Sequence, residues 1–533
     1  MALTLEQAIG QQFLLSFVGK QRPPEEVLTA LRQHRAGGFV LFRAKNMGSL
    51  AELRGLTAAL QAAAAQEGQP PLLIAADQEG GQLMAIGDGT PFPGNLALGA
   101  TRSEKLAYRV GRALGREVAA VGVNVNFAPV CDVNNNPDNP VVGTRSFGED
   151  PALVARLSAA MVRGIQAAGV AATAKHFPGH GDTASDSHHA APVIPHGLDR
   201  LSRIELPPFK AAIAAGVRVI MTAHIVLPAL NEGRDVPATL SPAILKGLLR
   251  RRLRFGGLVV SDAMDMKAID QGAGLVVDTL AAAAAGVDLM LFNLDPAQQA
   301  SAHAALIQAA RRGLLPTKDV HESARRILRL KAWLKGRKQP PLDVVGSREH
   351  RALAREVAAA SVTLVRDQAG RIPVRLAPED RIAVVVPRPE DLTPADTSSY
   401  LVPALASALS RHHPRVDEFF VSMNPSPSDV RALCGTLAAY DLVVLGTINA
   451  TAHPGQAALV KAVVKQGTPA IAVALRMPYD LAAYPAAPTY ACTYSILPPS
   501  MDAMADALFG KTPFPGRLPV SLPKHLVGRA PKQ

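Results

Sequence analysis

Short apolar runs alternate with longer amphipathic segments along the first two thirds of the chain. Between the runs lie Ala-rich stretches with helical periodicity, for example at residues 50–67, 103–120, 151–168 and 207–215. Eight apolar runs have the length of buried strands, and they fall at residues 13–18, 38–42, 72–77, 121–130, 171–176, 217–224, 258–262 and 287–292. This alternation predicts a (β/α)8 barrel, also called a TIM barrel, closed by a helix over 317–335.

The same alternation begins again after Lys338-Gln339-Pro340-Pro341. The two prolines predict a linker over residues 338–346, between a barrel domain at 1–337 and a second domain at 347–533. A helix over 348–360 leads into five apolar runs at 382–386, 418–421, 442–446, 470–475 and 489–494, with helices such as 456–466 and 501–510 between them. This pattern predicts a doubly wound α/β sandwich. We expect a structural role for it, and a binding or dimerisation role is the alternative.

Composition places the chain among globular proteins. Of its 533 residues, 48% are hydrophobic and 19% are charged, and the length suggests two domains. The N-terminus lacks a basic segment before its apolar residues, and no run reaches the roughly 18 apolar residues of a membrane span. Cys131, Cys434 and Cys492 are scattered without metal-ligand spacing. We therefore expect a soluble, cytoplasmic protein with no membrane partner.

The net charge of +12 raises the question of a nucleic-acid partner. The densest basic patch, from Lys246 to Arg254, falls on an expected helix just before a strand, where it is typical of a solvated helix face. Aromatic residues make up only 4% of the chain, so platforms for stacking bases are scarce. We expect no nucleic-acid partner, and the positive charge favours an anionic substrate.

The densest group of titratable residues follows the expected strand at 171–176. The sequence from Lys175 to His188 reads KHFPGHGDTASDSH, and five of the fourteen histidines lie in or just after it. Pro178 and Gly179 prevent a helix at this point, so the segment begins at the C-terminal mouth of a strand. A TIM barrel places its active site there, where polar residues also end other strands: Asp77 with Glu79, Asp132, His224 and Asp262.

Two carboxylates in this set suggest specific chemistry. Asp262 ends the apolar run at 258–262 and is our candidate nucleophile; capping a following helix is the alternative role. Asp186 stands two residues before His188, so its carboxylate could orient the imidazole and raise its basicity. That pair would make His188 a general acid and base that titrates near neutral pH.

The segment from Lys175 to His188 fits, without a mismatch, the pattern K-H-F-P-G-H-G-x(4)-D-S-H. In this it resembles bacterial β-N-acetylglucosaminidases of glycoside hydrolase family 3, of the type that recycles peptidoglycan. Further stretches are similar to other parts of that family: DQEGG at 77–81 to a sugar-binding turn, NPVVGTRSFG at 139–148 to an arginine loop, VSD at 260–262 to the nucleophile strand, and GRLPVSLP at 516–523 to the close of the second domain.

The resemblance implies a retaining, exo-acting β-N-acetylhexosaminidase without a metal or other cofactor. Asp262 would attack the anomeric carbon, and His188, oriented by Asp186, would protonate the leaving oxygen and later activate water. The nonreducing-end N-acetylglucosamine of muropeptides, chitooligosaccharides or related glycosides would then be held by four residues: Asp77, Arg145, Lys175 and His176.

The chain departs from the family pattern in two places. Gln82-Leu83 stands where the family commonly has arginine and then valine, so an ion pair behind the sugar is absent or comes from elsewhere. After His188, the sequence His189-Ala190-Ala191 replaces the usual leucine and proline, which bears on how the loop closes.

Three other activities stay open. The first is a β-N-acetylglucosaminide phosphorylase, because a neutral histidine does not repel an incoming phosphate as a glutamate would. The second is a β-glycosidase of broader specificity. The third is a metal-dependent hydrolase, since His and Asp at strand ends also build zinc sites; Pro178 nevertheless prevents a helix from placing His176 and His180 on one face.

Overall fold

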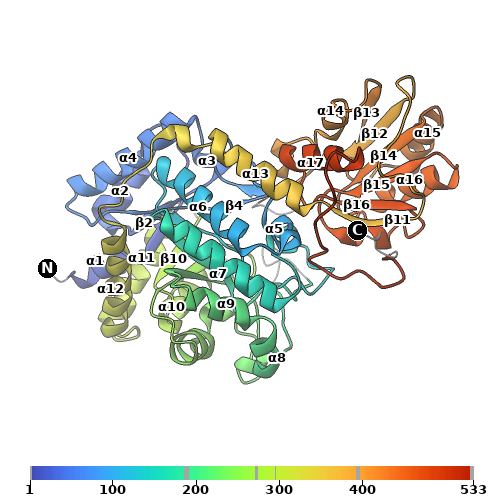
Figure 1. Ribbon diagram of the computed structural model, residues 1–533. Helices are drawn as coiled ribbons and strands as arrows, with labels where there is room; N and C mark the ends of the chain where they lie inside the picture. The colour runs from blue at the N-terminus through green and yellow to red at the C-terminus, as the bar shows by residue number, and fades with distance from the viewer. Residues whose placement is uncertain (1–2, 185–190, 270–273, 294–295, 392–395, 528–533) are drawn as a thin grey trace.

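The computed structural model describes residues 3–184, 191–269, 274–293, 296–391 and 396–527. It contains two α/β units, which lie side by side in Figure 1. The first is a closed barrel of parallel strands in the order β1-β10-β9-β8-β7-β6-β3-β2, so the predicted (β/α)8 barrel is confirmed. Its strands are β1 (Phe13–Leu15), β2 (Gly38–Leu41), β3 (Leu73–Ala76), β6 (Val125–Asn126), β7 (Ala171–Phe177), β8 (Val219–Thr222), β9 (Leu258–Ala263) and β10 (Leu289–Phe292).

Most barrel strands are shorter than the apolar runs that predicted them. The run at 121–130 is the largest difference, because only Val125 and Asn126 form the strand β6. Gly122 has a φ of 86° and turns the chain out of the preceding helix, and Pro129 has no N–H to donate to a neighbouring strand. Val130 still forms an isolated parallel bridge with Lys175. The residues after β6 are therefore loop, although they stay against the barrel.

Helices cover the outside of the barrel, close to the predicted positions (Figure 1). Ser49, for example, forms a capping box with Glu52 at the start of α4. The helices around the barrel are α1 (Leu5–Gly10), α2 (Glu25–His34), α4 (Leu50–Gln66), α6 (Glu104–Ala120), α7 (Pro151–Ala167), α9 (Leu206–Ala214), α10 (Leu275–Ala285), α11 (Pro296–Arg311) and α12 (Thr317–Leu334). Buried side chains between these helices and the strands form the largest apolar cluster of the protein.

The basic segment before β9 is helical, as expected, but it is not only a solvated face. It forms a π-helix, η4 (Ala243–Arg252), in which Arg250 turns inward. The Arg250 guanidinium lies 2.5 Å from a carboxylate oxygen of the buried Asp288, and Arg326 approaches the other oxygen at 2.9 Å. Part of the positive charge in this segment is thus paired with a buried carboxylate instead of facing solvent.

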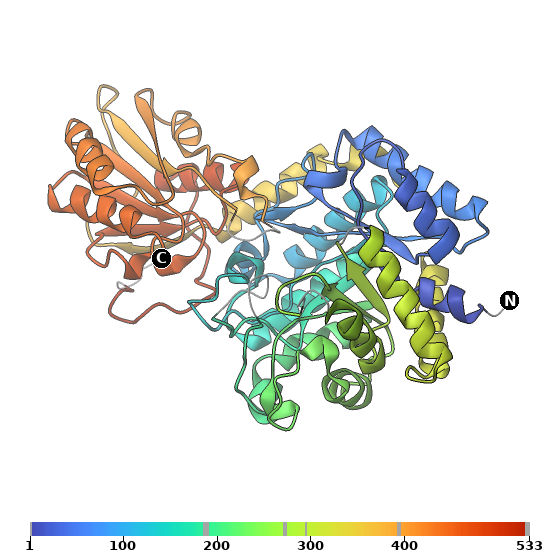
Figure 2. The same cartoon turned by 180° about the vertical axis from the view of Figure 1, so that it is seen from behind.

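The second unit is a single sheet with helices on both faces, as Figure 2 shows from behind. The predicted doubly wound arrangement is confirmed, with strand order β11-β16-β15-β14-β12-β13. The strands are β11 (Thr363–Asp367), β12 (Ile382–Pro387), β13 (Val416–Val421), β14 (Leu442–Thr447), β15 (Ala470–Ala474) and β16 (Thr489–Cys492). The helices are α13 (Arg348–Ser361), α14 (Leu405–Leu409), α15 (Pro427–Leu437), α16 (Pro454–Lys465) and α17 (Pro498–Leu508). Sequence analysis missed β11, which pairs antiparallel to β16 at the sheet edge.

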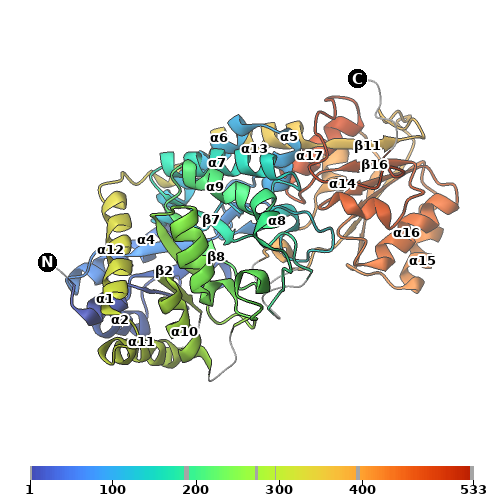
Figure 3. The same cartoon turned by 90° about the horizontal axis from the view of Figure 1, so that it is seen from below.

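The helix α13 lies between the two units and packs against helices of both (Figure 3). It contacts α6 and the short barrel helix α5 (Asn95–Thr101) on one side and α17 on the other. The division of the chain at residues 338–346 stays a prediction. Within the described part of the chain, none of the helices combines the length and the apolar character needed to pass through a bilayer.

Candidate active site

A cavity of about 540 Å³ opens at the C-terminal ends of the barrel strands. Five of the seven predicted catalytic and sugar-binding residues line it, and these are Asp77, Arg145, Lys175, His176 and Asp262. They come from chain segments that are up to 185 residues apart, and the barrel brings them to one place. Asp186 and His188, the predicted acid/base pair, lie outside the residues that the structure describes.

The first group of side chains is a network of four charges beside β3 and β7. Lys175 lies 2.5 Å from Asp77 and 2.6 Å from Glu79, and its side chain is only 1% exposed. Arg145 donates to both carboxylate oxygens of Glu79, from Nε at 3.0 Å and from Nη2 at 2.8 Å. Asp77 is the most open member, with a side chain that is 24% exposed and faces the cavity. The buried three therefore hold Asp77 where it can accept hydrogen bonds from a ligand.

Glu79 stays ionised within this network. Burial raises the pKa of Glu79, but the neighbouring Arg145 and Lys175 more than offset this and hold the pKa at about 2. Burial lowers the pKa of Lys175, and the carboxylates of Asp77 and Glu79 outweigh this, so the net change is upward. Two cations and two anions thus balance in a space that water hardly reaches.

Glu79 sits on a short hairpin formed by β4 (Gln78–Gly80) and β5 (Leu83–Met84). Sequence analysis noted Glu79 at a strand end and assigned it no role. The structure shows that Lys175 and Arg145 supply its ion pairs, so the arginine missing at position 82 is not needed for that purpose. The side chain of Gln82 instead accepts a hydrogen bond from Thr144, at 2.6 Å.

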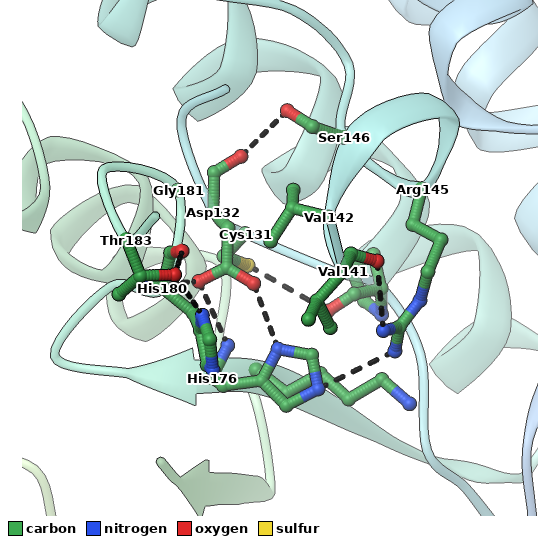
Figure 4. A network of polar contacts seen from close by, with 12 residues as sticks. Cys131, Asp132, Val141, Val142, Arg145, Ser146, His176, His180, Gly181 and Thr183 are labelled. Atoms are coloured by element: carbon green, nitrogen blue, oxygen red, sulfur yellow. Dashed lines mark hydrogen bonds and ion pairs between the residues drawn. The ribbon is translucent and has the colours of Figure 1, made fainter. Parts of the chain in front are cut away.

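The second group surrounds Asp132, which is fully buried (Figure 4). One carboxylate oxygen lies 2.7 Å from Nδ1 of His176, and the other accepts the backbone N–H groups of His176 and His180, at 3.1 and 2.7 Å. Because the carboxylate accepts at Nδ1, that atom carries the proton, and Nε2 of His176 points toward Arg145 at 3.4 Å. Asp132 thereby fixes the ring of His176 and the start of the following loop.

Charges within this second group favour an ionised Asp132 beside a neutral His180. Burial raises the pKa of Asp132, but His176 and His180 lower it further, so the net change is downward. Burial lowers the pKa of His180 to about 4. At neutral pH the His180 ring is therefore uncharged, and it has no surplus proton to give to a leaving group.

Asn139 of the arginine loop at 139–148 binds the loop after β7, within which Thr183 contacts His180. Asn139 donates from Nδ2 to the backbone oxygens of His180 and Gly181, at 2.8 and 3.1 Å. The hydroxyl of Thr183 lies 2.8 Å from Nδ1 of His180 (Figure 4). The NPVVGTRSFG motif contained Asn139, but sequence alone did not reveal its contact with residues about 40 positions later.

Asp262 lies across the barrel from Asp77. It belongs to β9, and four steps around the barrel in either direction separate β9 from β3, after which Asp77 follows. Residues 264–269 form turns, and the next described helix begins at Leu275, so Asp262 does not cap a helix. A sugar held at Asp77 would extend across the barrel toward Asp262, as expected of a nucleophile.

Two further residues support the end of β9. His224 is fully buried, and its Nε2 lies 3.0 Å from the backbone oxygen of Ala263, while its Nδ1 contacts Thr239 at 2.8 Å. Asp265 lines the cavity and accepts the backbone N–H of Asn293 at 3.2 Å. Burial raises the pKa of Asp265. His224 was expected among the polar strand ends, and it is not one of the residues that line the cavity.

The described residues include no group of three or more His, Cys, Asp or Glu side chains that could hold a metal ion. Of the pair considered in the sequence, the ring of His176 contacts Asp132, whereas the ring of His180 contacts the hydroxyl of Thr183.

Replacing Arg145 tests whether the arginine loop contributes binding energy. We expect Arg145→Ala to lower kcat/KM by an amount equivalent to about 2 to 4 kcal/mol, because it removes charge-assisted bonds in a desolvated site. Arg145→Lys should recover only part of this loss, since it keeps the charge without the bidentate bond to Glu79. A change of only a few-fold would mean that Arg145 merely organises its loop.

Comparison with known proteins places this site in a family. Residues 4–330 match the sequence profile described as "Glycosyl hydrolase family 3 N terminal domain". The chain is similar to the structure of a glycoside hydrolase family 3 beta-N-acetylglucosaminidase from Paenibacillus sp. str. FPU-7, with a TM-score of 0.91 and 36% identity over 98% of this chain and 99% of that one. It is also 34% identical to the beta-N-acetylglucosaminidase/beta-glucosidase of Cellulomonas fimi, over 88% of this chain and 87% of that protein.

The chain is also similar to the structure of a phosphorylase. The match to this beta-glucoside phosphorylase covers 97% of this chain and 94% of the phosphorylase chain, with a TM-score of 0.81 and 26% identity.

Proposed function

The chain belongs to glycosyl hydrolase family 3, and from this membership we propose that it releases β-linked N-acetylglucosamine from the nonreducing end of its substrates, with retention of configuration. The observation that carries the proposal is the arrangement of the cavity. A charged, buried sugar-binding group around Asp77 faces a carboxylate, Asp262, across the barrel.

In the first step the sugar binds at the charged group. Asp77, Arg145, Lys175 and His176 line the cavity and offer both acceptors and donors to the hydroxyl and N-acetyl groups. Because Glu79 and Asp132 fix these side chains from behind, the site is organised before the substrate arrives. Bound there, the sugar presents its anomeric carbon to the opposite side of the barrel.

Asp262 then attacks the anomeric carbon, and a covalent glycosyl-enzyme forms as the glycosidic bond breaks. His188 gives its proton to the leaving oxygen and next takes a proton from the water that releases the sugar. Asp186 orients His188. The roles of Asp186 and His188 rest on the KHFPGHGDTASDSH motif, and the burial of His180 keeps that neighbouring ring uncharged at neutral pH.

Two lysines of the cavity favour anionic substrates. Lys45 and Lys267 both line the cavity, and the chain has a net charge of +12. Muropeptides carry carboxylates and match this charge better than neutral chitooligosaccharides do. A cytoplasmic role in the recycling of peptidoglycan follows from this choice of substrate.

Phosphate, in place of water, is the second candidate acceptor of the sugar. The similarity to a beta-glucoside phosphorylase is the observation that favours this alternative. One experiment tests both candidates. Purified protein is given an aryl β-N-acetylglucosaminide or an aryl β-glucoside, with and without phosphate, and the products are separated. Hydrolysis yields free N-acetylglucosamine in both buffers, and phosphorolysis yields the sugar 1-phosphate only with phosphate. Absence of cleavage of the N-acetylglucosaminide would contradict the proposed function.

Replacing His188 tests the acid role. We expect His188→Ala to slow cleavage of substrates with a sugar leaving group by about 10²- to 10⁴-fold, the usual contribution of a general acid. Glycosylation by an activated aryl glycoside should fall much less, because its leaving group hardly needs a proton. Asp186→Ala should also slow cleavage of the substrate with a sugar leaving group more than that of the aryl glycoside, but both rates should fall less than in His188→Ala. Equal losses on both substrates in pre-steady-state glycosylation would remove His188 from this role.

A further inference from the structure

A short segment of the second unit reaches the hairpin that carries Glu79. The backbone N–H of Thr397 donates to the backbone oxygen of Gln82 at 2.9 Å, and the Thr397 hydroxyl donates to the same oxygen at 2.8 Å. The hydroxyl also accepts the backbone N–H of Met84, at 3.3 Å. Thr397 is 8% exposed, so these bonds form away from water. One threonine thus holds both the turn between β4 and β5 and the strand β5 that follows it.

A buried ion pair fixes this segment within its own unit. Arg476 follows β15 and is 2% exposed, and its Nη2 lies 3.2 Å from a carboxylate oxygen of Asp396, which is 4% exposed. Arg476 also donates to the hydroxyl of Ser398. The other oxygen of Asp396 accepts from the backbone and the hydroxyl of Ser398, at 2.9 and 2.6 Å. Paired charges without water hold one geometry, so Thr397 has a defined position.

The hairpin in turn contacts the arginine loop. The Gln82 side chain accepts from the hydroxyl of Thr144 at 2.6 Å, and Thr144 precedes Arg145. The second unit meets the same loop at Pro519, whose backbone oxygen accepts from Glu149 at 3.1 Å. Gly148, at a φ of 141°, packs so closely that a Cβ would lie 2.4 Å from that oxygen. The second unit therefore contacts the loop directly at Pro519 and is connected to it indirectly through Gln82.

The same segment forms a wall behind Asp77. A side cavity of about 190 Å³ lies between the units and shares four lining residues with the main cavity, namely Phe42, Ala44, Asp77 and Leu83. Its opposite wall contains Asp396, Thr397 and Tyr400 from the second unit. Asp77 is thus placed between the sugar site and the second unit.

We propose that the second unit positions the sugar-binding side chains, with Thr397 as the positioning residue. Thr397 holds Gln82 and, through it, both the hairpin beside Asp77 and the loop that carries Arg145. That the bound ligand is a sugar rests on the proposed function, whereas the hydrogen bonds from Thr397 to the hairpin and from the hairpin to the arginine loop do not depend on it. The second unit then has a part in substrate recognition beyond the purely structural role expected from the sequence.

The test compares Thr397→Val with Thr397→Ser. We expect Thr397→Val to lower kcat/KM on an aryl β-N-acetylglucosaminide by about 10-fold or more, because displacing binding groups by even a fraction of an ångström weakens alignment. KM should carry most of the loss, since Asp77 and Arg145 hold parts of the sugar away from the reacting bond. Thr397→Ser retains the hydroxyl and should stay within about two-fold of the wild type.

Thr447→Val is the matched control. Thr447 is a buried threonine of the second unit whose hydroxyl donates to Asp480 at 2.7 Å, and it lies in β14 within the sheet. Its replacement should lower the melting temperature without changing KM. Should Thr447→Val raise KM as much as Thr397→Val, the effect would come from general destabilisation, and the positioning role would be wrong.

Amide hydrogen exchange gives a readout that does not depend on activity. In Thr397→Val we expect faster exchange at Met84 and across residues 142–146, with protection in the barrel helices unchanged. Thr144→Val should speed exchange in 142–146 alone, which provides a second variant if Thr397→Val does not fold. Unchanged exchange at these amides would overturn the proposal. A wild type that cleaves no N-acetylglucosaminide would contradict only the proposed function, because the exchange experiment remains valid.

Discussion

Asp262→Ala is expected to reduce kcat/KM on an aryl β-N-acetylglucosaminide to roughly a ten-thousandth of the wild-type value or less, in line with the loss of a catalytic nucleophile. The covalent intermediate in the proposed reaction needs this carboxylate. Folding should be retained, because Asp262 lies at the cavity end of β9 and is only partly buried.

Two comparisons make this test specific to the nucleophile. Asp265→Ala removes a second carboxylate from the same cavity three residues later and should leave much more activity. Added azide should restore turnover of an activated aryl glycoside in Asp262→Ala, because a small anion fits where the carboxylate was and can attack the anomeric carbon. Near-normal rates in Asp262→Ala would show that the nucleophile has been assigned wrongly.

Local patterns were enough to predict where the described site residues come from. The apolar run before Lys175 and the run that ends in Asp262 each fix a strand and its polar end, and a barrel directs such ends into one cavity. Helices such as α4 and α7 were predicted equally well, because each has helical periodicity and a polar residue at its N-cap. For these elements, one segment contains all the information that its structure requires.

The partners of those residues were not predictable in the same way. His176 binds Asp132 across 44 positions, and Thr397 reaches Gln82 across 315 positions. No periodicity relates such pairs, because the closure of the barrel and the packing of the second unit create the contact. The strand β11 was missed for a similar reason: its edge position depends on pairing with β16, which follows more than 100 residues later.

Glu79 is the residue whose importance the structure changes most, and Glu79→Gln should have the largest effect on stability. The substitution keeps the shape of the side chain but leaves Arg145 and Lys175 buried with Asp77 as the remaining carboxylate of the network. Breaking a buried ion pair on one side costs about 3 to 5 kcal/mol, because the remaining charges stay desolvated. Urea unfolding at pH 7 should show a loss of this size, together with weaker sugar binding.

Acid should remove the same stabilisation from the wild type. The pKa of Glu79 is about 2 in the folded protein, against an ordinary value of 4.5. A carboxyl group whose pKa is lower in the folded than in the unfolded protein stabilises the fold. This stabilisation is complete at pH values above the unfolded pKa, and it is lost as the pH falls from about 4.5 toward 2. Glu79→Gln lacks this contribution, so its stability should fall less steeply than that of the wild type over the same interval.

Glu205→Gln is the control for this interpretation. Glu205 is also buried and bound to an arginine, Arg200 at 2.7 Å, but here burial outweighs the arginine, so the net change in the pKa of Glu205 is upward. Its charge is therefore unfavourable in the folded protein, and Glu205→Gln should leave stability at pH 7 unchanged or slightly higher. If Glu79→Gln and Glu205→Gln unfolded at the same urea concentration as the wild type, the charge network behind Asp77 would contribute nothing to stability. The site would then owe its organisation to the hairpin backbone alone.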